Sequence, residues 1–307
     1  MHLTNRTARI TPRSRHLLRH TALAIACAAL FAALAALVQT GWHPLDRLDH
    51  AWTDGLHRYA RDHTAWTAAM QTLSDIGGTV TMRTLLGIAA LWLWLIGARV
   101  LACWVAAQTL AGWGAQWAFK LAFDRERPAF ADPVSHAGGP AFPSGHAMAS
   151  AITCAVLVGL FWSRTGRGGR IAACSVAALA VLAVGWTRIA LGVHWPSDVL
   201  GGWLAAGIVL GTVTVAVELW RPGALARDVR RVNWRTRPRV QRVLVSPTGA
   251  TPSGVTSTGV TPAGPDRHDP APGSTADRPD ARSAEAHHRR PADAPASARR
   301  TPPPGSP

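Results

Sequence analysis

The chain has 307 residues, of which 48% are hydrophobic and only 16% are charged, and its formal net charge is +15. An ordinary soluble protein has no place for long apolar runs without charges, so the composition excludes that class and favours a membrane protein. The positive charge does not indicate nucleic acid binding, because the arginines lie beside the apolar runs and mainly on one side of the topology that the runs predict.

Six apolar runs approach or exceed the roughly 18 to 20 residues that a helix needs to cross the hydrocarbon core of a bilayer. The fourth and fifth are short and could be buried helices instead, but six evenly spaced runs favour a polytopic bundle. The sequence therefore predicts an all-α fold, a six-transmembrane helix bundle with spans at about 21–39, 79–97, 100–119, 147–162, 171–187 and 199–219.

The first run follows an arginine-rich segment and contains small residues, so it could also be a cleaved signal peptide. Its apolar part is longer than the roughly 7 to 15 residues of a signal-peptide core, which favours a retained anchor. All four cysteines of the chain lie inside apolar runs, without metal-ligand or disulfide spacing, and we expect them to be packing residues.

Between the first two runs, apolar residues recur at helical spacing among polar ones. This pattern predicts a helix in the membrane interface or, equally, a short amphipathic cap on the bundle. The residues that define it are Leu45, Leu48, Trp52, Leu56 and Tyr59.

Arginines mark one side of the predicted bundle. Five precede the first run, others separate the second run from the third and the fourth from the fifth, and eight lie between Arg221 and Arg242. Segment 41–78, on the other side, holds five aspartates and three arginines. By the positive-inside rule, we expect a multi-pass protein of the cell (inner or plasma) membrane with both termini in the cytoplasm.

The predicted organisation is a cytoplasmic basic N-terminus (1–20), a six-span domain (21–220), an arginine-rich juxtamembrane segment (221–245) and a tail (246–307). The tail is rich in proline, glycine, serine, threonine and alanine without apolar periodicity, so we expect it to be disordered. The arginines from Arg221 to Arg242 could hold anionic lipid headgroups. A solvated segment with no specific partner is the alternative.

Three polar clusters interrupt the apolar pattern, at 120–128, 143–146 and 188–198. They lie at the ends of the third and fifth predicted spans and at the starts of the fourth and sixth. Because these four helix ends belong to one face of a six-span bundle, we expect the clusters to converge on the extracytoplasmic side.

The first and third clusters supply three cations. Lys120 is the only lysine of the chain, which hints at a chemical requirement for a compact ammonium, although an isolated lysine could simply snorkel at a span end. Arg127 and Arg188 would clamp phosphate oxygens. No carboxylate cluster and no His/Cys spacing in this region predicts a divalent metal, so we expect the cations alone to stabilise a phosphoryl group.

The second cluster, Pro143-Ser144-Gly145-His146, opens the fourth predicted span. The Ser144 hydroxyl and the free N–H groups of Gly145 and His146 at the helix start suit an anion. His146, among cations at a helix N-terminus, should give up a proton readily, which suits a general acid and base.

His194 is followed four residues later by Asp198, across a Trp-Pro pair that is well placed to start a helix. A carboxylate that accepts one imidazole N–H fixes the tautomer and makes the other nitrogen a better nucleophile. A histidine and an aspartate at this spacing often occur by chance. The neighbouring cations are the reason to consider this pair functional.

These residues resemble the signature of the type-2 phosphatidic acid phosphatase superfamily, which also includes vanadium haloperoxidases and bacterial acid phosphatases. Its three parts are present in order, and the resemblance covers about residues 41–219. The family usually has serine where this chain has Thr187, a minor change because the hydroxyl is kept. The three parts are Lys120-x6-Arg127-Pro128, Pro143-Ser144-Gly145-His146 and Arg188-x5-His194-x3-Asp198.

The resemblance implies that His194 forms a phosphohistidine, that Asp198 orients it and that His146 is the acid and base. It also implies a phosphate site without metal or other cofactor, made by Lys120, Arg127, Ser144, Gly145 and Arg188. Six spans favour the membrane lipid phosphatases of the superfamily, acting on a polyprenyl diphosphate or a phosphatidate-like lipid at the outer leaflet. The alternatives are a vanadate-dependent haloperoxidase and a non-catalytic membrane scaffold or transporter.

Overall fold

A computed structural model describes residues 12–232. The described part is all helical, as predicted, with one short 3-10 turn at Trp162–Arg164. Its helices are α1 (Pro12–Gln39), α2 (His43–Asp62), α3 (Thr64–Ile76), α4 (Thr79–Leu95), α5 (Arg99–Phe123), α6 (Gly145–Phe161), α7 (Arg167–Ala190), α8 (Pro196–Trp220) and α9 (Ala224–Val232). The predicted disordered tail and residues 1–11 lie outside the described residues.

Each of the six predicted spans falls on one helix, namely α1, α4, α5, α6, α7 or α8. Five described segments are long and apolar enough to cross a membrane: Ser14–Gln39, Thr64–Leu95, Gly145–Arg164, Arg167–Ala190 and Pro196–Trp220. Helix α5 has 25 residues, which is sufficient length, but it carries Gln108 and Gln116 and does not meet the same hydropathy criterion. The count of six spans therefore stays a prediction.

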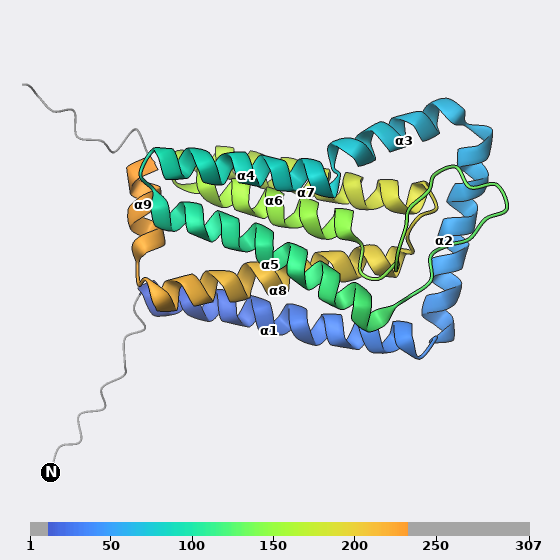
Figure 1. The fold of residues 1–307 in the computed structure, drawn as a ribbon, viewed down its shortest axis with the longest axis horizontal. Coiled ribbons are helices and arrows are strands. Elements are labelled where there is room, and N and C mark those ends of the chain that lie inside the picture. Colours follow the sequence, from blue (N-terminus) through green and yellow to red (C-terminus); the bar gives the residue numbers. More distant parts are fainter. Residues whose placement is uncertain (1–11, 233–307) are drawn as a thin grey trace, which may run out of the picture. The chain divides into compact units, whose positions relative to one another are not determined.

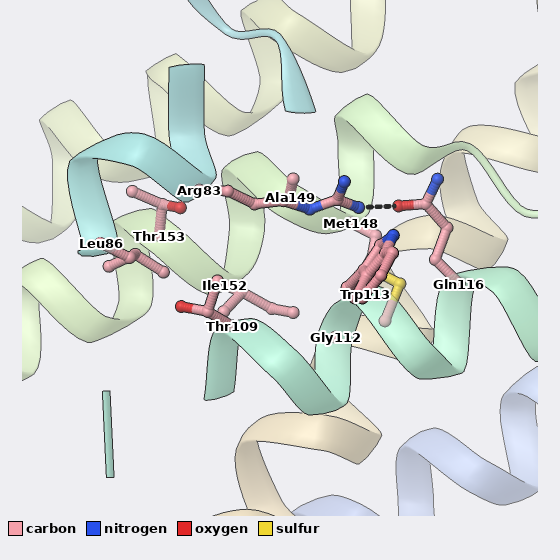
Figure 2. A pocket seen from close by; sticks show the side chains of 10 residues that line it. All are labelled: Arg83, Leu86, Thr109, Gly112, Trp113, Gln116, Met148, Ala149, Ile152 and Thr153. Carbon is pink, nitrogen blue, oxygen red and sulfur yellow. Dashed lines mark hydrogen bonds between the residues drawn. The ribbon is translucent and has the colours of Figure 1, made fainter. Parts of the chain in front are cut away.

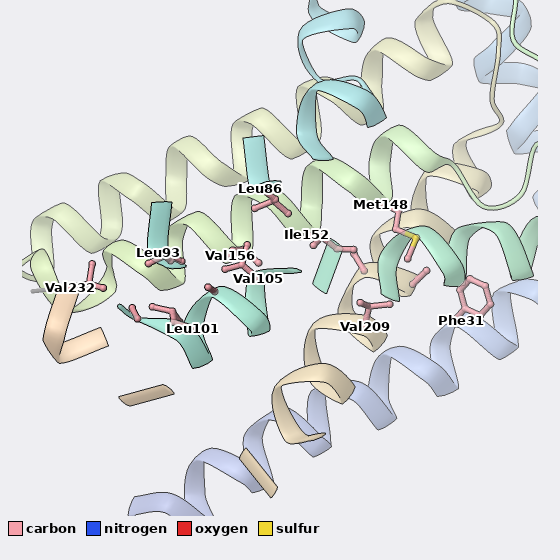
Figure 3. Packing of buried hydrophobic residues seen from close by; sticks show 14 of the residues in the cluster. Phe31, Leu86, Leu93, Leu101, Val105, Met148, Ile152, Val156, Val209 and Val232 are labelled. Carbon is pink, nitrogen blue, oxygen red and sulfur yellow. The ribbon is translucent and has the colours of Figure 1, made fainter. Parts of the chain in front are cut away.

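The long helices run side by side (Figure 1). Helices α1, α4, α5, α6 and α8 share one apolar core, and a smaller cluster of Ala147, Ile189 and Val199 joins α7 to α6 and α8. Helix α1 packs on α8, α4 on α5, and α6 on both α7 and α8. Glycines allow the α1 and α8 backbones to approach closely, since an added Cβ at Gly207 or Gly211 would lie within 2.7 Å of α1 atoms. The core side chains, shown in Figure 3, include Phe31, Leu86, Leu93, Leu101, Val105, Met148, Ile152, Val156, Val209 and Val232.

Helix α2 crosses one end of the bundle (Figure 1). It is an amphipathic helix, so the prediction for this segment is confirmed. Its polar face is the buried one: Asp49, Thr53 and His57 are shielded from solvent. Leu48 and Trp52 on the opposite face are exposed. The helix therefore caps the bundle with its polar side, which places charged groups next to the ends of the other helices.

At the other end of the bundle, α9 lies inside the segment predicted to be arginine-rich and juxtamembrane. Asp228 of α9 accepts hydrogen bonds from the backbone N–H groups of Val100 and Leu101, at 2.9 and 3.2 Å. These are unpaired donors of the first turn of α5, so a side chain from a distant helix caps it. Residues 233–245 of the same segment lie outside the described residues.

Helices α6 and α8 cross closely at the end that α2 covers. A Cβ added to Gly202 of α8 would lie 2.6 Å from the carbonyl oxygen of Ser144 and 3.0 Å from the Cβ of Ala147. Because the nearest of these atoms is backbone, it cannot move aside without shifting α6. Gly202 thus fixes how near the start of α6 comes to α8.

We expect Gly202→Ala to destabilise the fold by about 1 to 3 kcal/mol through overpacking, and to lower the temperature of thermal unfolding in detergent. The matched control is Gly87→Ala in α4, where an added Cβ meets nothing within 4 Å. That change should be neutral or slightly stabilising because alanine has the higher helix propensity. Equal unfolding temperatures for Gly202→Ala and the unsubstituted protein would contradict the expectation.

Candidate active site

The predicted site residues converge at the end of the bundle that α2 crosses. Lys120 lies in the last turn of α5 and Arg188 in the last turn of α7, while His146 and Asp198 lie in the first turns of α6 and α8. His146 is within electrostatic range of Lys120, Arg127, Arg188 and His194. The prediction that the three clusters meet on one face is confirmed.

His194 is buried and held between a carboxylate and a guanidinium. Its Nδ1 lies 3.3 Å from Oδ2 of Asp198, and its Nε2 lies 3.1 Å from Nη1 of Arg127. A guanidinium can only donate and an ionised carboxylate can only accept. The neighbours therefore select the tautomer with the proton on Nδ1 and the lone pair on Nε2.

Burial lowers the pKa of His194 to about 4, and Arg127 and Arg188 act in the same direction. The hydrogen bond and the charge of Asp198 oppose this shift but do not cancel it. Since a group with a pKa of about 4 is deprotonated at neutral pH, the imidazole is neutral there, and its Nε2, which accepts from Arg127 in this structure, carries the lone pair that a nucleophile needs.

Two of the predicted phosphate contacts donate to backbone carbonyls of the loops that precede α6 and α8. Lys120 donates from Nζ to the carbonyl oxygen of Pro140 at 2.7 Å. Arg127 donates from Nε to Gly139 at 2.8 Å and from Nη1 to Val193 at 2.6 Å. These neutral carbonyls fix the direction of both cations without neutralising them.

The two other predicted phosphate-binding side chains, those of Arg188 and Ser144, each contain a buried atom without a hydrogen-bond partner. Among the described residues, Nε of Arg188 and Oγ of Ser144 are fully buried and have no hydrogen-bond partner. Nη1 of Arg188 donates to Oγ of Ser74, which belongs to α3. A buried donor without an acceptor costs about 1 to 3 kcal/mol, so both atoms suit an oxygen-rich ligand.

Gly145, the last of the predicted phosphate contacts, begins α6 directly after the capping position of Ser144. A Cβ there would lie 2.4 Å from Nε2 of Gln116. The site thus needs glycine because the Gln116 side chain of α5 fills the adjacent space. Sequence reasoning missed Gln116 and Ser74, and neither carries a signal beyond being a polar residue at or near an apolar run.

Arg125 is a third residue that the sequence did not single out. Its Nη1 donates to Oδ1 of Asp198 at 2.7 Å, and its Nη2 donates to Oδ2 of Asp49 at 2.8 Å. Oδ2 of Asp198 accepts from Trp195 N at 2.9 Å, so both of its oxygens are engaged. The position of Arg125 two residues before Arg127, inside the first motif, is the signal that could have found it.

Asp49 also accepts from the backbone N–H and the hydroxyl of Ser197 in the first turn of α8. Ser144 donates its backbone N–H to the carbonyl oxygen of Asp198 at 2.9 Å, which joins the second and third motifs directly. In the part of the chain from 12 to 232, no group of three or more His, Cys, Asp or Glu side chains is arranged to hold a metal ion.

Comparison with known proteins finds matches over the part of the chain that carries these residues. Residues 97–222 match the PAP2 superfamily. The putative undecaprenyl-diphosphatase YbjG of Escherichia coli (strain K12) is 33% identical over 135 residues, which is 42% of this chain. The match spans 63% of the length of that relative.

A solved structure is also similar, the first transmembrane PAP2 type phosphatidylglycerolphosphate phosphatase from Bacillus subtilis. The TM-score is 0.52 at 22% sequence identity, and the match covers 64% of this chain and 94% of that one. At this identity the likeness shows a shared fold. The chain is a multi-pass membrane protein, and its residues 97–222, which carry all three motifs, are similar to the PAP2 superfamily.

Proposed function

We propose that this protein is a metal-independent lipid phosphatase that hydrolyses a phosphomonoester or diphosphate of a lipid through a phosphohistidine. The observation that carries the proposal is the geometry of His194, whose Nδ1 faces Asp198 and whose Nε2 faces the Arg127 guanidinium. The name of the E. coli relative, a putative undecaprenyl-diphosphatase, supports a phosphatase that acts on lipid diphosphates.

In the first half-reaction, Nε2 of His194 attacks the terminal phosphorus and forms a P–N bond. The P–O bond to the lipid breaks, and His146 donates a proton to the departing oxygen. Asp198 accepts the Nδ1–H bond and stabilises the positive charge that develops on the ring. The groups that hold the remaining phosphoryl oxygens are Lys120, Arg127, Arg188, the Ser144 hydroxyl and the Gly145 N–H.

In the second half-reaction, His146 takes a proton from water as the water oxygen attacks phosphorus. The P–N bond breaks, inorganic phosphate leaves and His194 returns to its neutral tautomer. His146 thereby regains the proton that it donates to the next leaving group. The same two histidines thus serve both steps without an external cofactor.

A lipid substrate follows from the position of the site. It lies at the end of helices long and apolar enough to span a membrane, beside α2 with its exposed Leu48 and Trp52. Such apolar side chains on an amphipathic helix suit the membrane interface, where lipid headgroups lie. The arginine distribution supports an extracytoplasmic site with both termini in the cytoplasm, and contact of Arg221 to Arg242 with anionic lipids.

The first test is phosphate release from polyprenyl and phosphatidate lipids by purified protein in detergent with EDTA. We expect full activity in EDTA, and loss of activity with no acid-labile phosphoprotein in His194→Ala, because His194 is the imidazole that Asp198 orients. Activity that disappears with EDTA, or that persists in His194→Ala, would refute the mechanism.

The second test is the pH dependence of kcat/KM. The acid limb should fall near pH 4 rather than 6.5, because the lowered pKa of His194 keeps its nucleophile neutral down to that pH. Asp198→Asn removes the charge that favours the imidazolium, so it should move the limb to lower pH and reduce kcat about a hundredfold or more. Enzyme returned from each pH to pH 7 controls for unfolding. A limb that stays in place in Asp198→Asn reports titration of the substrate and contradicts the assignment.

The third test concerns Arg125, which we assign as a positioning residue because it contacts Asp198. Arg125→Met should lower kcat by at least about tenfold and leave KM within about twofold, since the substrate keeps all its own contacts. Arg125→Lys should recover part of the loss. The control is Arg61→Met, which removes another ion-paired arginine, the partner of Asp132. A rise in KM without a change in kcat would assign Arg125 to substrate binding instead.

A further inference from the structure

A further cation, Arg83, lines a narrow pocket between α4, α5 and α6 near the site (Figure 2). Arg83 extends from α4 across this pocket, and its Nη2 donates to Oε1 of Gln116 at 2.7 Å. Among the ion pairs of residues 12–232, none includes Arg83. A half-buried guanidinium whose acceptor is a neutral amide keeps its full charge for an anion.

Gln116 connects this guanidinium to the proposed phosphate site in two directions. It precedes Lys120 by one turn on the same face of α5. Its side chain also lies against Gly145, where an added Cβ would be 2.4 Å from Nε2 and 3.0 Å from Oε1. Arg83 is therefore one hydrogen bond and one van der Waals contact away from the residue that begins α6.

The pocket lies beside the first turns of α6. Its α6 wall is formed by Met148, Ala149 and residues further along the helix, beginning two residues after His146. His146 is the proposed donor to the departing oxygen. Leu86, Trp113 and Ile152 make the rest of the wall largely apolar, as a lipid requires.

We propose that Arg83 binds the second phosphate of a lipid diphosphate, the one that remains on the lipid. The inference rests on the proposed function and names its preferred substrate class. The bond between the terminal phosphorus and the bridging oxygen breaks, Nε2 of His194 takes the phosphoryl group, and His146 protonates the bridging oxygen. The lipid monophosphate that leaves carries the negative charge that Arg83 stabilises, and water later releases inorganic phosphate from His194.

A contact between Arg83 and the second phosphate distinguishes lipid diphosphates from lipid monophosphates. Both classes place their terminal phosphate at the same catalytic residues. A lipid with a single phosphate places that phosphate at His194 and has an alcohol as its leaving group, so it offers Arg83 no charge. A diphosphate lipid offers one phosphate to each set of cations. The guanidinium therefore contributes to specificity and not to the attack itself.

The experiment compares Arg83→Met, Arg83→Lys and the unsubstituted protein on polyprenyl diphosphate and polyprenyl monophosphate of the same chain length. We expect Arg83→Met to raise KM or lower kcat/KM for the diphosphate by about tenfold or more, with the monophosphate changed by less than about twofold. Arg83→Lys should keep part of the preference. The control is Arg99→Met, at the opposite end of α5, which should affect neither substrate.

Inhibition by a non-hydrolysable polyprenyl methylenebisphosphonate provides a readout besides turnover. Its inhibition constant should rise in Arg83→Met, while that of the matching monophosphonate stays constant. Inorganic pyrophosphate separates a lipid diphosphate from free diphosphate, and we expect it to inhibit the protein far more weakly. Equal losses on both lipids, or a preference of the unsubstituted protein for the monophosphate, would overturn the role of Arg83 and leave the phosphatase intact. Hydrolysis of neither lipid would overturn the proposed function itself.

Discussion

The arrangement of the site residues, at the end of the bundle that α2 crosses, depends on the carboxylate of Asp198. It has no solvent exposure, and burying an ionised carboxylate is costly unless it is paired and hydrogen-bonded. One of its oxygens takes the guanidinium of Arg125, and the other takes the Trp195 N–H and faces the imidazole of His194. Because both oxygens are used, the carboxylate cannot rotate, and neither can the ring it holds.

The same constraint explains why α2 packs with its polar face inward. Arg125 can face Asp198 only if its other end is also satisfied, and Asp49 of α2 does this while accepting from Ser197. The chain therefore places a second buried carboxylate opposite the first, with one guanidinium between them. Removing either acid would leave a buried charge without its partner, which costs more than a surface ion pair is worth.

Most of the helical framework and the membership of the site could be predicted from the sequence. Length and hydropathy locate the helices, and counting predicted spans brings Lys120, His146 and Arg188 to one end. Asp49, Ser74, Arg125 and Gln116 could not be found in this way, because each acts through a partner far away in the chain. The inward polar face of α2 was equally inaccessible, since periodicity identifies an amphipathic helix but does not say which side the rest of the protein covers.

The balance of charge at the site explains how one arrangement can serve both folding and binding. Asp198 makes its direct ion pair with Arg125 and not with the cations proposed to hold phosphate. Arg127 and Arg188 both act electrostatically against Lys120, and Arg83 adds a further charge beside Gln116. Mutual repulsion among these groups is tolerable because backbone carbonyls and hydroxyls hold their side chains in place. In the proposed complex, an anion with two phosphates would supply the negative charge that the fold omits, and its binding would lower the repulsion between groups that are already in position.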